Sequence, residues 1–249
     1  MIAGESPPAV PGDWARGLRP VVRSRNAARQ AYDRASRWYG LVEEPFERRP
    51  RRVGQRLLHV LPGERVLDVG CGPGAALVDL ARAVGQGGSV LGVDLSPAMA
   101  DRAASHVRQA GVAGRVRIRV ADGAALPWPD GSFDALFASF TLELFDTPEI
   151  PVVLAEWRRV LRPGGRAVIV SLSRSGPVSR MTRAYERLHD RFPASLDCRP
   201  IHAALALEAG GFVVVRRILV PLFGLRVEAV LASRPTPDPD LNGASEVTS

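Results

Sequence analysis

Short apolar runs alternate with longer amphipathic stretches through the middle of the chain. The runs with the length and apolar content of strands are residues 65–69, 89–93, 115–120, 133–139 and 166–172. Between them, residues 75–84, 97–110 and 150–161 carry apolar positions at helical spacing, bounded by glycine, proline or serine. Strands that alternate with helices predict an α/β fold, with helices on both faces of a parallel sheet.

The end of this pattern is different. After a predicted helix near residues 201–209, strand-like runs at 212–220 and 226–232 are separated only by residues 221–225. A connection this short cannot cross over a parallel sheet, so the two runs must form an antiparallel hairpin. The sequence therefore predicts a seven-stranded, mostly parallel sheet with a terminal antiparallel hairpin.

The two ends of the chain differ from its middle in composition. Residues 1–20 and 233–249 are rich in proline and small residues, and we expect disordered tails there. Residues 21–232 are expected to form one domain. Within this domain, we expect residues 21–59 to form helices that cover one end of the sheet. Residues 173–199 are expected to form a lid over the binding pocket at that end.

Composition excludes several classes of protein. The chain has 249 residues and is 46% hydrophobic, which suffices for one sizeable core. No apolar run approaches the roughly 18 residues of a membrane span, and the N-terminus lacks a signal-peptide pattern. Cys71 and Cys198 fit no zinc or redox spacing. We expect both to be packing residues in a reducing cytoplasm, and we expect no metal.

The charge is strongly positive. The formal net charge is +7 and the pI is about 10.7. The sequence contains no lysine, so all of its 33 basic residues of the lysine and arginine types are arginines. A positive surface favours anionic partners such as phosphates, acidic lipids or nucleic acid. Residues 48–52, Arg-Arg-Pro-Arg-Arg, could contact anionic lipid or a substrate phosphate, or could form a solvated helix edge.

The segment after the first strand is the main candidate for a binding site. Asp68 is followed by Gly70, Gly72 and Gly74, and a predicted helix begins directly afterwards. Glycines let the backbone approach a ligand without an intervening Cβ, and the helix N-terminus points N–H groups at that ligand. The second strand ends at Asp94, where an acid can accept ribose hydroxyls.

These features alone fit two kinds of cofactor. Gly70, Gly72 and Ala75 also satisfy the loose nicotinamide-dinucleotide fingerprint. Asp68 argues against that fingerprint, because it would repel a diphosphate and attract an amino-acid ammonium. After the third strand, Asp122 precedes Gly123, and a short acid there suits the exocyclic amine of adenine. The terminal hairpin is also not expected of a nicotinamide fold.

The ordered set of motifs resembles class I S-adenosylmethionine-dependent methyltransferases. Residues 68–74 (Asp-Val-Gly-Cys-Gly-Pro-Gly) resemble motif I and Val93-Asp94 resembles motif II. Residues 122–134 and 161–165 resemble the segments that follow, so the similarity spans about half the chain. Within the class, the closest pattern is that of the ubiquinone/menaquinone-biosynthesis C-methyltransferases and their relatives of unassigned substrate. The resemblance implies a Rossmann-like fold and S-adenosyl-L-methionine as cofactor.

The resemblance also implies roles for individual residues. Gly70, Gly72 and Gly74 would lie against the methionine part of the cofactor, and Asp68 would orient its ammonium. Asp94 would accept both ribose hydroxyls. The remaining expected cofactor contacts are Asp122 and Gly123 to adenine and Ser139 to the methionine side.

Methyl transfer of this kind proceeds by in-line attack on the sulfonium methyl, so the protein contributes mainly alignment. A general base is needed only where the nucleophile must lose a proton. Glu143, after the fourth strand, and His189, in the lid, are the candidates. Each also has an ordinary explanation, as a first-turn helix acid and as a lid-packing residue.

The expected acceptor is a small or lipid-like molecule: a quinone, a phospholipid head group or a secondary metabolite. Residues 197–201 differ from the quinone enzymes, which weakens the case for a quinone. One alternative is a nucleic-acid methyltransferase, which the pI suggests but for which an Asn-Pro-Pro-aromatic motif is missing. The other is a non-catalytic nucleotide-binding module or a dehydrogenase.

Overall fold

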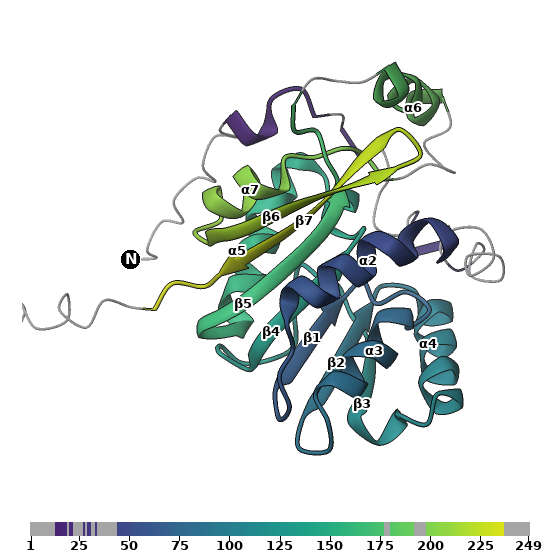
Figure 1. Cartoon of the computed structure of the whole chain (residues 1–249), viewed down its shortest axis with the longest axis vertical. Coiled ribbons are helices and arrows are strands. Elements are labelled where there is room, and N and C mark those ends of the chain that lie inside the picture. Colours follow the sequence, from purple (N-terminus) through teal and green to yellow (C-terminus); the bar gives the residue numbers. More distant parts are fainter. Residues whose placement is uncertain are drawn as a thin grey trace, which may run out of the picture.

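The computed structural model describes residues 13–18, 20–21, 27, 29–30, 33, 44–176, 180–191 and 198–236. A seven-stranded sheet with the order β3-β2-β1-β4-β5-β7-β6 runs through the molecule (Figure 1). The strands are β1 (Arg65–Val69), β2 (Ser89–Asp94), β3 (Val116–Val120), β4 (Phe133–Ser139), β5 (Leu161–Leu172), β6 (Val213–Leu222) and β7 (Leu225–Ser233). Strands β1 to β5 pair in parallel, whereas β7 is antiparallel to both β5 and β6. The predicted α/β fold with its reversed terminal hairpin is confirmed.

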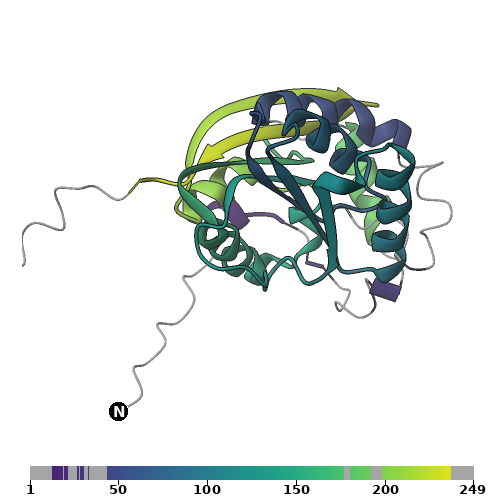
Figure 2. The same ribbon diagram turned by 90° about the horizontal axis from the view of Figure 1, so that it is seen from below.

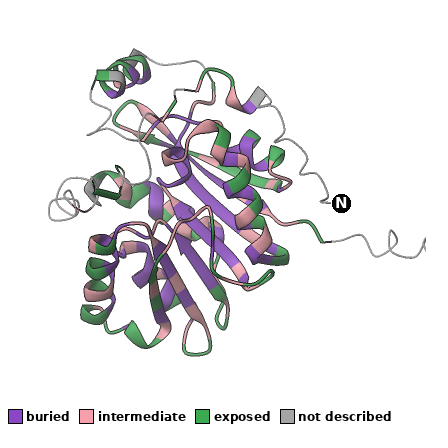
Figure 3. Cartoon of the chain, turned by 180° about the vertical axis from the view of Figure 1, so that it is seen from behind, coloured by how far each residue is buried: buried purple, intermediate pink, exposed green. Residues whose placement is uncertain are grey.

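Helices cover both faces of the sheet, as the alternation of the sequence predicts (Figure 1 and Figure 2). The helices are α2 (Glu44–Leu58), α3 (Ala75–Ala83), α4 (Pro97–Gln109), α5 (Ile150–Val160), α6 (Arg180–Arg191) and α7 (Ala203–Ala209). Short 3-10 turns are η1 (Asp13–Ala15), η2 (Ala113–Arg115), η3 (Leu142–Leu144) and η4 (Thr147–Glu149). Residues of α2, α3 and α4 share one apolar core with the sheet, and residues of η1, α5 and α7 share the other. Buried residues therefore concentrate in the central strands (Figure 3).

The hairpin is tighter than the sequence predicts. Its strands extend to Leu222 and Leu225, which pair with each other, so that only Phe223 and Gly224 form the turn. Both turn residues have positive φ, 47° and 83°, as a two-residue hairpin turn with the right-handed twist of its strands requires. The predicted boundaries were too short because Pro221 suggests a loop, whereas it lies in β6, the last strand in the sheet order.

Strand β5 begins earlier than the predicted residue 166. Leu161 pairs with Phe133, and the register then shifts before Arg166 pairs with Ala135. The Pro163-Gly164-Gly165 segment reads as a turn from sequence alone. A partner distant in sequence holds it at the start of the strand. Gly164 N–H donates to the Arg234 carbonyl at 3.0 Å, and Arg234 N–H donates to the Gly165 carbonyl at 2.8 Å.

The residues that the structure describes include part of the predicted N-terminal tail. Trp14 lies within the stretch 1–20, yet its side chain is 5% exposed and packs in the core shared with α5 and α7. The composition of the stretch did not indicate this, because one large apolar side chain changes an average very little. Burial of that side chain nevertheless stabilises the fold substantially. Residues 1–12 and 237–249 lie outside the described residues. None of the described helices is both long and apolar enough to cross a membrane.

Candidate active site

The glycine turn that follows β1 is tied to the end of β2. Gly70 and Cys71 donate their N–H groups to the Val93 carbonyl at 2.8 and 2.9 Å. Gly72 N–H donates to Asp94 Oδ2 at 2.8 Å. The structure thus brings the glycine segment and the acid at the tip of the neighbouring strand together, as the sequence-based cofactor assignment requires.

Asp94 is a half-buried carboxylate at the end of β2 that can accept further hydrogen bonds. Its Oδ1 accepts from Ser96 N–H at 2.9 Å while Oδ2 accepts from Gly72. Burial raises the pKa of Asp94, and the hydrogen bonds from Ser96 and Gly72 oppose that shift. An ionised carboxylate has about four lone-pair sites, so two neighbouring hydroxyl donors can still bind to it.

Asp68 is the second acid at the turn and is only 2% exposed. The pKa of Asp68 is raised to about 7, mainly because the carboxyl group is buried. The positive charge of Arg51 opposes this shift, and the negative charge of Asp94 adds to it. Its Oδ2 is buried without a hydrogen-bond partner among the described residues. A buried carboxylate in this state is stabilised by a cation, so the site fits a positively charged ligand group.

The glycines of the turn have different surroundings. Gly70 has φ of 69°, and a Cβ there would overlap the Thr141 side chain. Gly72 has φ of 51°, and a Cβ there would meet nothing within 4 Å. Gly70 is therefore required by packing within the protein, whereas Gly72 faces open space beside Asp94.

Two further segments reach the same edge of the sheet. Ala121 N–H donates to the Asp94 carbonyl at 3.1 Å, which places Asp122 next to β2, and Asp122 Oδ1 accepts from Ala124 N–H at 2.9 Å. Gly123 has a packing role, because a Cβ there would lie 2.8 Å from Val69 Cγ1. Ser139 ends β4, and its buried Oγ has no hydrogen-bond partner among the described residues.

Glu143 lies in η3, with its side chain fully buried. Its Oε1 accepts from Leu172 N–H at 3.2 Å. Arg199, 1% exposed, donates from Nε to the Glu143 carbonyl at 3.2 Å and from Nη2 to the Phe145 carbonyl at 2.7 Å. Its Nη1 donates to Thr147 Oγ1 at 3.0 Å. Arg199 thus joins the segment after β4 to the end of the predicted lid, a role that sequence reasoning missed.

Comparison with known proteins supports one family. A family model described as a methyltransferase domain matches residues 66–165. Nocamycin O-methyltransferase of Saccharothrix syringae is 36% identical over 195 residues, covering 68% of this chain and 67% of that protein. The chain belongs to the S-adenosylmethionine-dependent methyltransferases. Its cofactor is S-adenosyl-L-methionine, and the nicotinamide alternative is set aside.

Further relatives agree with this assignment. The ubiquinone/menaquinone biosynthesis C-methyltransferase of Geobacter sulfurreducens is 35% identical over 172 residues, covering 69% of this chain and 64% of that enzyme. The chain thus spans about two thirds of the length of both relatives. A geranyl diphosphate methyltransferase, solved with geranyl diphosphate and sinefungin, superposes with a TM-score of 0.61. At 22% identity, covering 75% of this chain and 77% of that one, it supports the fold.

The two glycines give a matched test of how the methyltransferase site is built. We expect Gly72→Ala to cost about 1 kcal/mol of folding free energy, for the left-handed backbone, and to weaken cofactor affinity at least tenfold. Gly70→Ala should cost about 2–4 kcal/mol, because overlap with Thr141 adds to the backbone strain. Urea unfolding and calorimetric titration with S-adenosylmethionine measure both. Wild-type affinity in Gly72→Ala would contradict the placement of the cofactor.

Cofactor binding should release a proton from Asp68. The pKa of Asp68 is about 7 in the free protein, and an adjacent ammonium would lower it. We expect up to about one proton released per cofactor near pH 6, falling toward zero above pH 8. Calorimetry in two buffers of different ionisation enthalpy counts that proton.

Asp68→Asn should abolish this release. Asp134→Asn is the matched control, because the hydrogen bonds of Asp134 with Arg65 and Arg162 hold its pKa below the usual range. Release that persists in Asp68→Asn would assign the proton to another group. The raised pKa of Asp68 also means that the cofactor-free protein loses stability as the pH rises from about 4 to about 7.

His189, the other candidate base, lies on α6 and is 7% exposed. This helix is next to the hairpin, since a Cβ on Gly224 would lie 3.1 Å from Met181 Cγ. Residues 177–179 and 192–197 of the predicted lid lie outside the described residues. Cys71 is buried and Cys198 partly buried, and both are free thiols, as expected for packing residues.

Proposed function

We propose that the enzyme transfers the methyl group of S-adenosylmethionine to a small, lipid-like acceptor. The observation that carries this proposal is the pairing of the glycine turn with Asp94 beside the buried carboxylate of Asp68. The sulfonium of the bound cofactor supplies an activated methyl group and its own leaving group. The names of the two sequence relatives, a nocamycin O-methyltransferase and a quinone C-methyltransferase, support an organic acceptor.

Within this proposal, each part of the cofactor has a partner of suitable chemistry. Asp94 accepts the ribose hydroxyls, and Asp68 holds the ammonium with Oδ2, which has no hydrogen-bond partner in the described part of the chain. Gly70, Gly72 and Gly74 line the methionine chain, with Ser139 Oγ as a further donor on that side. Asp122 and Gly123 meet the adenine. Alignment of the two reactants is then the main contribution of the protein to the rate.

The two candidates for a general base differ in their surroundings. The full burial of Glu143 and its hydrogen bond from Leu172 support a positioning role, in which Glu143 fixes the segment after β4. His189 remains the proposed base for an acceptor that must lose a proton. Its replacement by Ala should lower kcat and leave the affinity for cofactor unchanged.

We also propose a cytoplasmic enzyme that contacts anionic membrane only peripherally. The four arginines of residues 48–52 on α2 support that contact. A lipid-like acceptor would dissolve in the membrane, so contact with the membrane would bring the enzyme close to its acceptor.

The test is methyl transfer from radiolabelled S-adenosylmethionine to a panel of acceptors. The panel contains a hydroxyquinone, a phenol, a primary amine, a phospholipid and an RNA. We expect label in one of the organic acceptors and none in RNA. Label in RNA alone, with an affinity that falls steeply with salt, would replace this proposal by the nucleic-acid alternative. Cofactor binding without any transfer would favour a binding module.

A further inference from the structure

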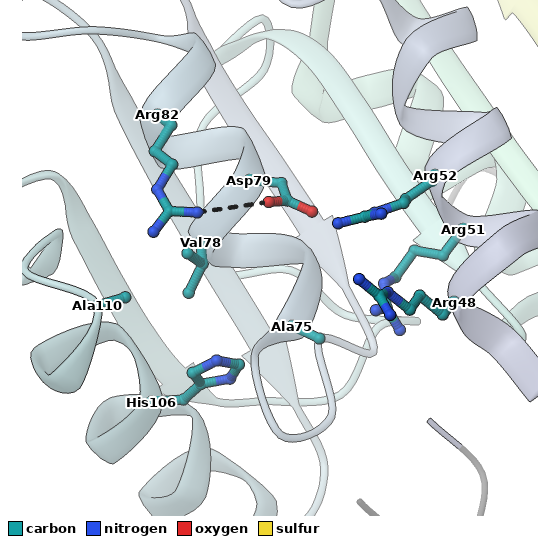
Figure 4. A pocket seen from close by; sticks show the side chains of 9 residues that line it. All are labelled: Arg48, Arg51, Arg52, Ala75, Val78, Asp79, Arg82, His106 and Ala110. Carbon is teal, nitrogen blue, oxygen red and sulfur yellow. Dashed lines mark ion pairs between the residues drawn. The ribbon is translucent and has the colours of Figure 1, made fainter. Parts of the chain in front are cut away.

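A basic groove crosses the outer side of α3, between α2 and α4 (Figure 4). Its volume is about 290 Å³. The charged and titratable side chains that line it are Arg48, Arg51, Arg52, Asp79, Arg82 and His106. In Figure 4 the arginines of α2 and His106 of α4 approach the start of α3 from opposite sides.

The positive charge of this groove is poorly neutralised. Asp79 is the one carboxylate among the described residues that line it, and it pairs with Arg82 at 3.9 Å. Their side chains are 39% and 62% exposed, so this ion pair contributes little. Arg48 and Arg52 form no ion pair with any residue that the structure describes. An anion would therefore find unused guanidinium groups here.

The position of Arg48 and Arg52 on α2 is unfavourable for the free protein. They are four residues apart on one helix, where like charges repel each other. The opposite side of α2 is pressed against the sheet, since a Cβ on Gly54 would overlap Val170. The two arginines therefore project outward together, and a bound anion would relieve their repulsion.

The rest of the lining favours a small, highly charged ligand. The other lining residues are small or aliphatic: Ala75, Val78 and Ala110. Ala75 begins α3, and the first turn of this helix contains no acidic residue that would repel an anion. The planar guanidinium groups match phosphate oxygens two at a time.

We propose that this groove binds a phosphate group, carried either by an anionic phospholipid or by a soluble phosphate ester. The groove is separate from the cofactor site, because neither Asp68, Gly72 nor Asp94 lines it. Arg51 is the exception: it is buried and its charge acts on Asp68, so we leave it out of the test. The proposal names the residues that would make the proposed membrane contact. It does not depend on any step of methyl transfer.

The test compares two double variants of the full chain, each saturated with S-adenosylhomocysteine. Arg48→Ala/Arg52→Ala removes the two groove arginines that form no ion pair with a described residue. Arg117→Ala/Arg119→Ala removes the same charge from exposed positions on β3. The soluble probe is inorganic pyrophosphate, followed by calorimetry. The membrane probe is a phosphatidylcholine vesicle with or without phosphatidylglycerol, followed by sedimentation.

We expect the groove variant to weaken binding of at least one probe tenfold or more, with the β3 variant close to wild type. A loss seen only with pyrophosphate identifies a soluble phosphate ester, and a loss seen only with phosphatidylglycerol vesicles identifies a lipid headgroup. Equal losses in both variants would show general charge attraction and overturn the proposal. The proposal would also be overturned if the wild-type protein bound neither probe, or if the groove variant lost cofactor affinity tenfold. The experiment does not measure methyl transfer, so its outcome is independent of whether the proposed acceptor class is correct.

Discussion

Asp94→Ala is expected to reduce affinity for S-adenosylmethionine at least a hundredfold while the protein still folds. The two hydrogen bonds that the ribose hydroxyls would donate to the Asp94 carboxylate are each worth about 1.5–3 kcal/mol, because the acceptor is charged. Every 1.4 kcal/mol is a factor of ten in affinity. Calorimetry measures the affinity, and circular dichroism during thermal unfolding measures the fold.

The fold should survive because the loss of Asp94 has two opposing effects. The N–H groups of Gly72 and Ser96 lose their acceptor. This lowers the free energy of unfolding by about 1–3 kcal/mol for each N–H group that water does not reach. Gly72 lies beside open space, where water can replace the carboxylate. Burial also raises the pKa of Asp94, so removing this charge recovers part of its desolvation cost.

Asp94→Asn is the matched control for this experiment. The amide oxygen can still accept from one of the two N–H groups, but the charge is gone and the NH₂ cannot accept a hydroxyl. We expect a smaller loss of affinity than in Asp94→Ala, with stability closer to wild type. Wild-type affinity in Asp94→Ala would assign the ribose to a different residue.

The sequence predicts the parts of this protein that depend on local pattern. Strands β1 and β4 match their predicted residues, because each is a short apolar run bounded by polar residues and leads into a turn. The contact of the glycine turn with Asp94 was also foreseeable, since parallel strands end at the same edge of a sheet. Ser96 caps α4, accepting from Met99 N–H at 3.1 Å, and a serine directly before Pro97 is a local signal for a helix start.

The parts that depend on distant partners could not be predicted in this way. The early start of β5 needs Arg234, which lies more than sixty residues further along the chain. The burial of Trp14 needs α7. The arginines of α2 were visible as a cluster, but the groove also needs Arg82 and His106 from two other helices. No local pattern distinguishes Arg199 from the many exposed arginines of the chain.

Arg199 is therefore where the structure adds most to the sequence, and Arg199→Met should lower the free energy of unfolding by about 3–5 kcal/mol. The guanidinium is buried beside Glu143, and burial lowers its pKa while Asp146 and Glu143 raise it. Its removal deprives two carbonyls and a hydroxyl of their donors. It also leaves the fully buried Glu143 without its neighbouring positive charge. Urea unfolding followed by circular dichroism measures this loss.

Two further variants separate the loss of charge from the loss of packing. Arg102→Met, at an exposed position of α4, should change stability by no more than about 0.5 kcal/mol. Combining Glu143→Gln with Arg199→Met should restore part of the lost stability, because the stranded carboxylate is then neutral. If the double variant were less stable than Arg199→Met alone, the hydrogen bonds of Arg199 to the backbone, rather than its charge, would be what holds the segment after β4 in place.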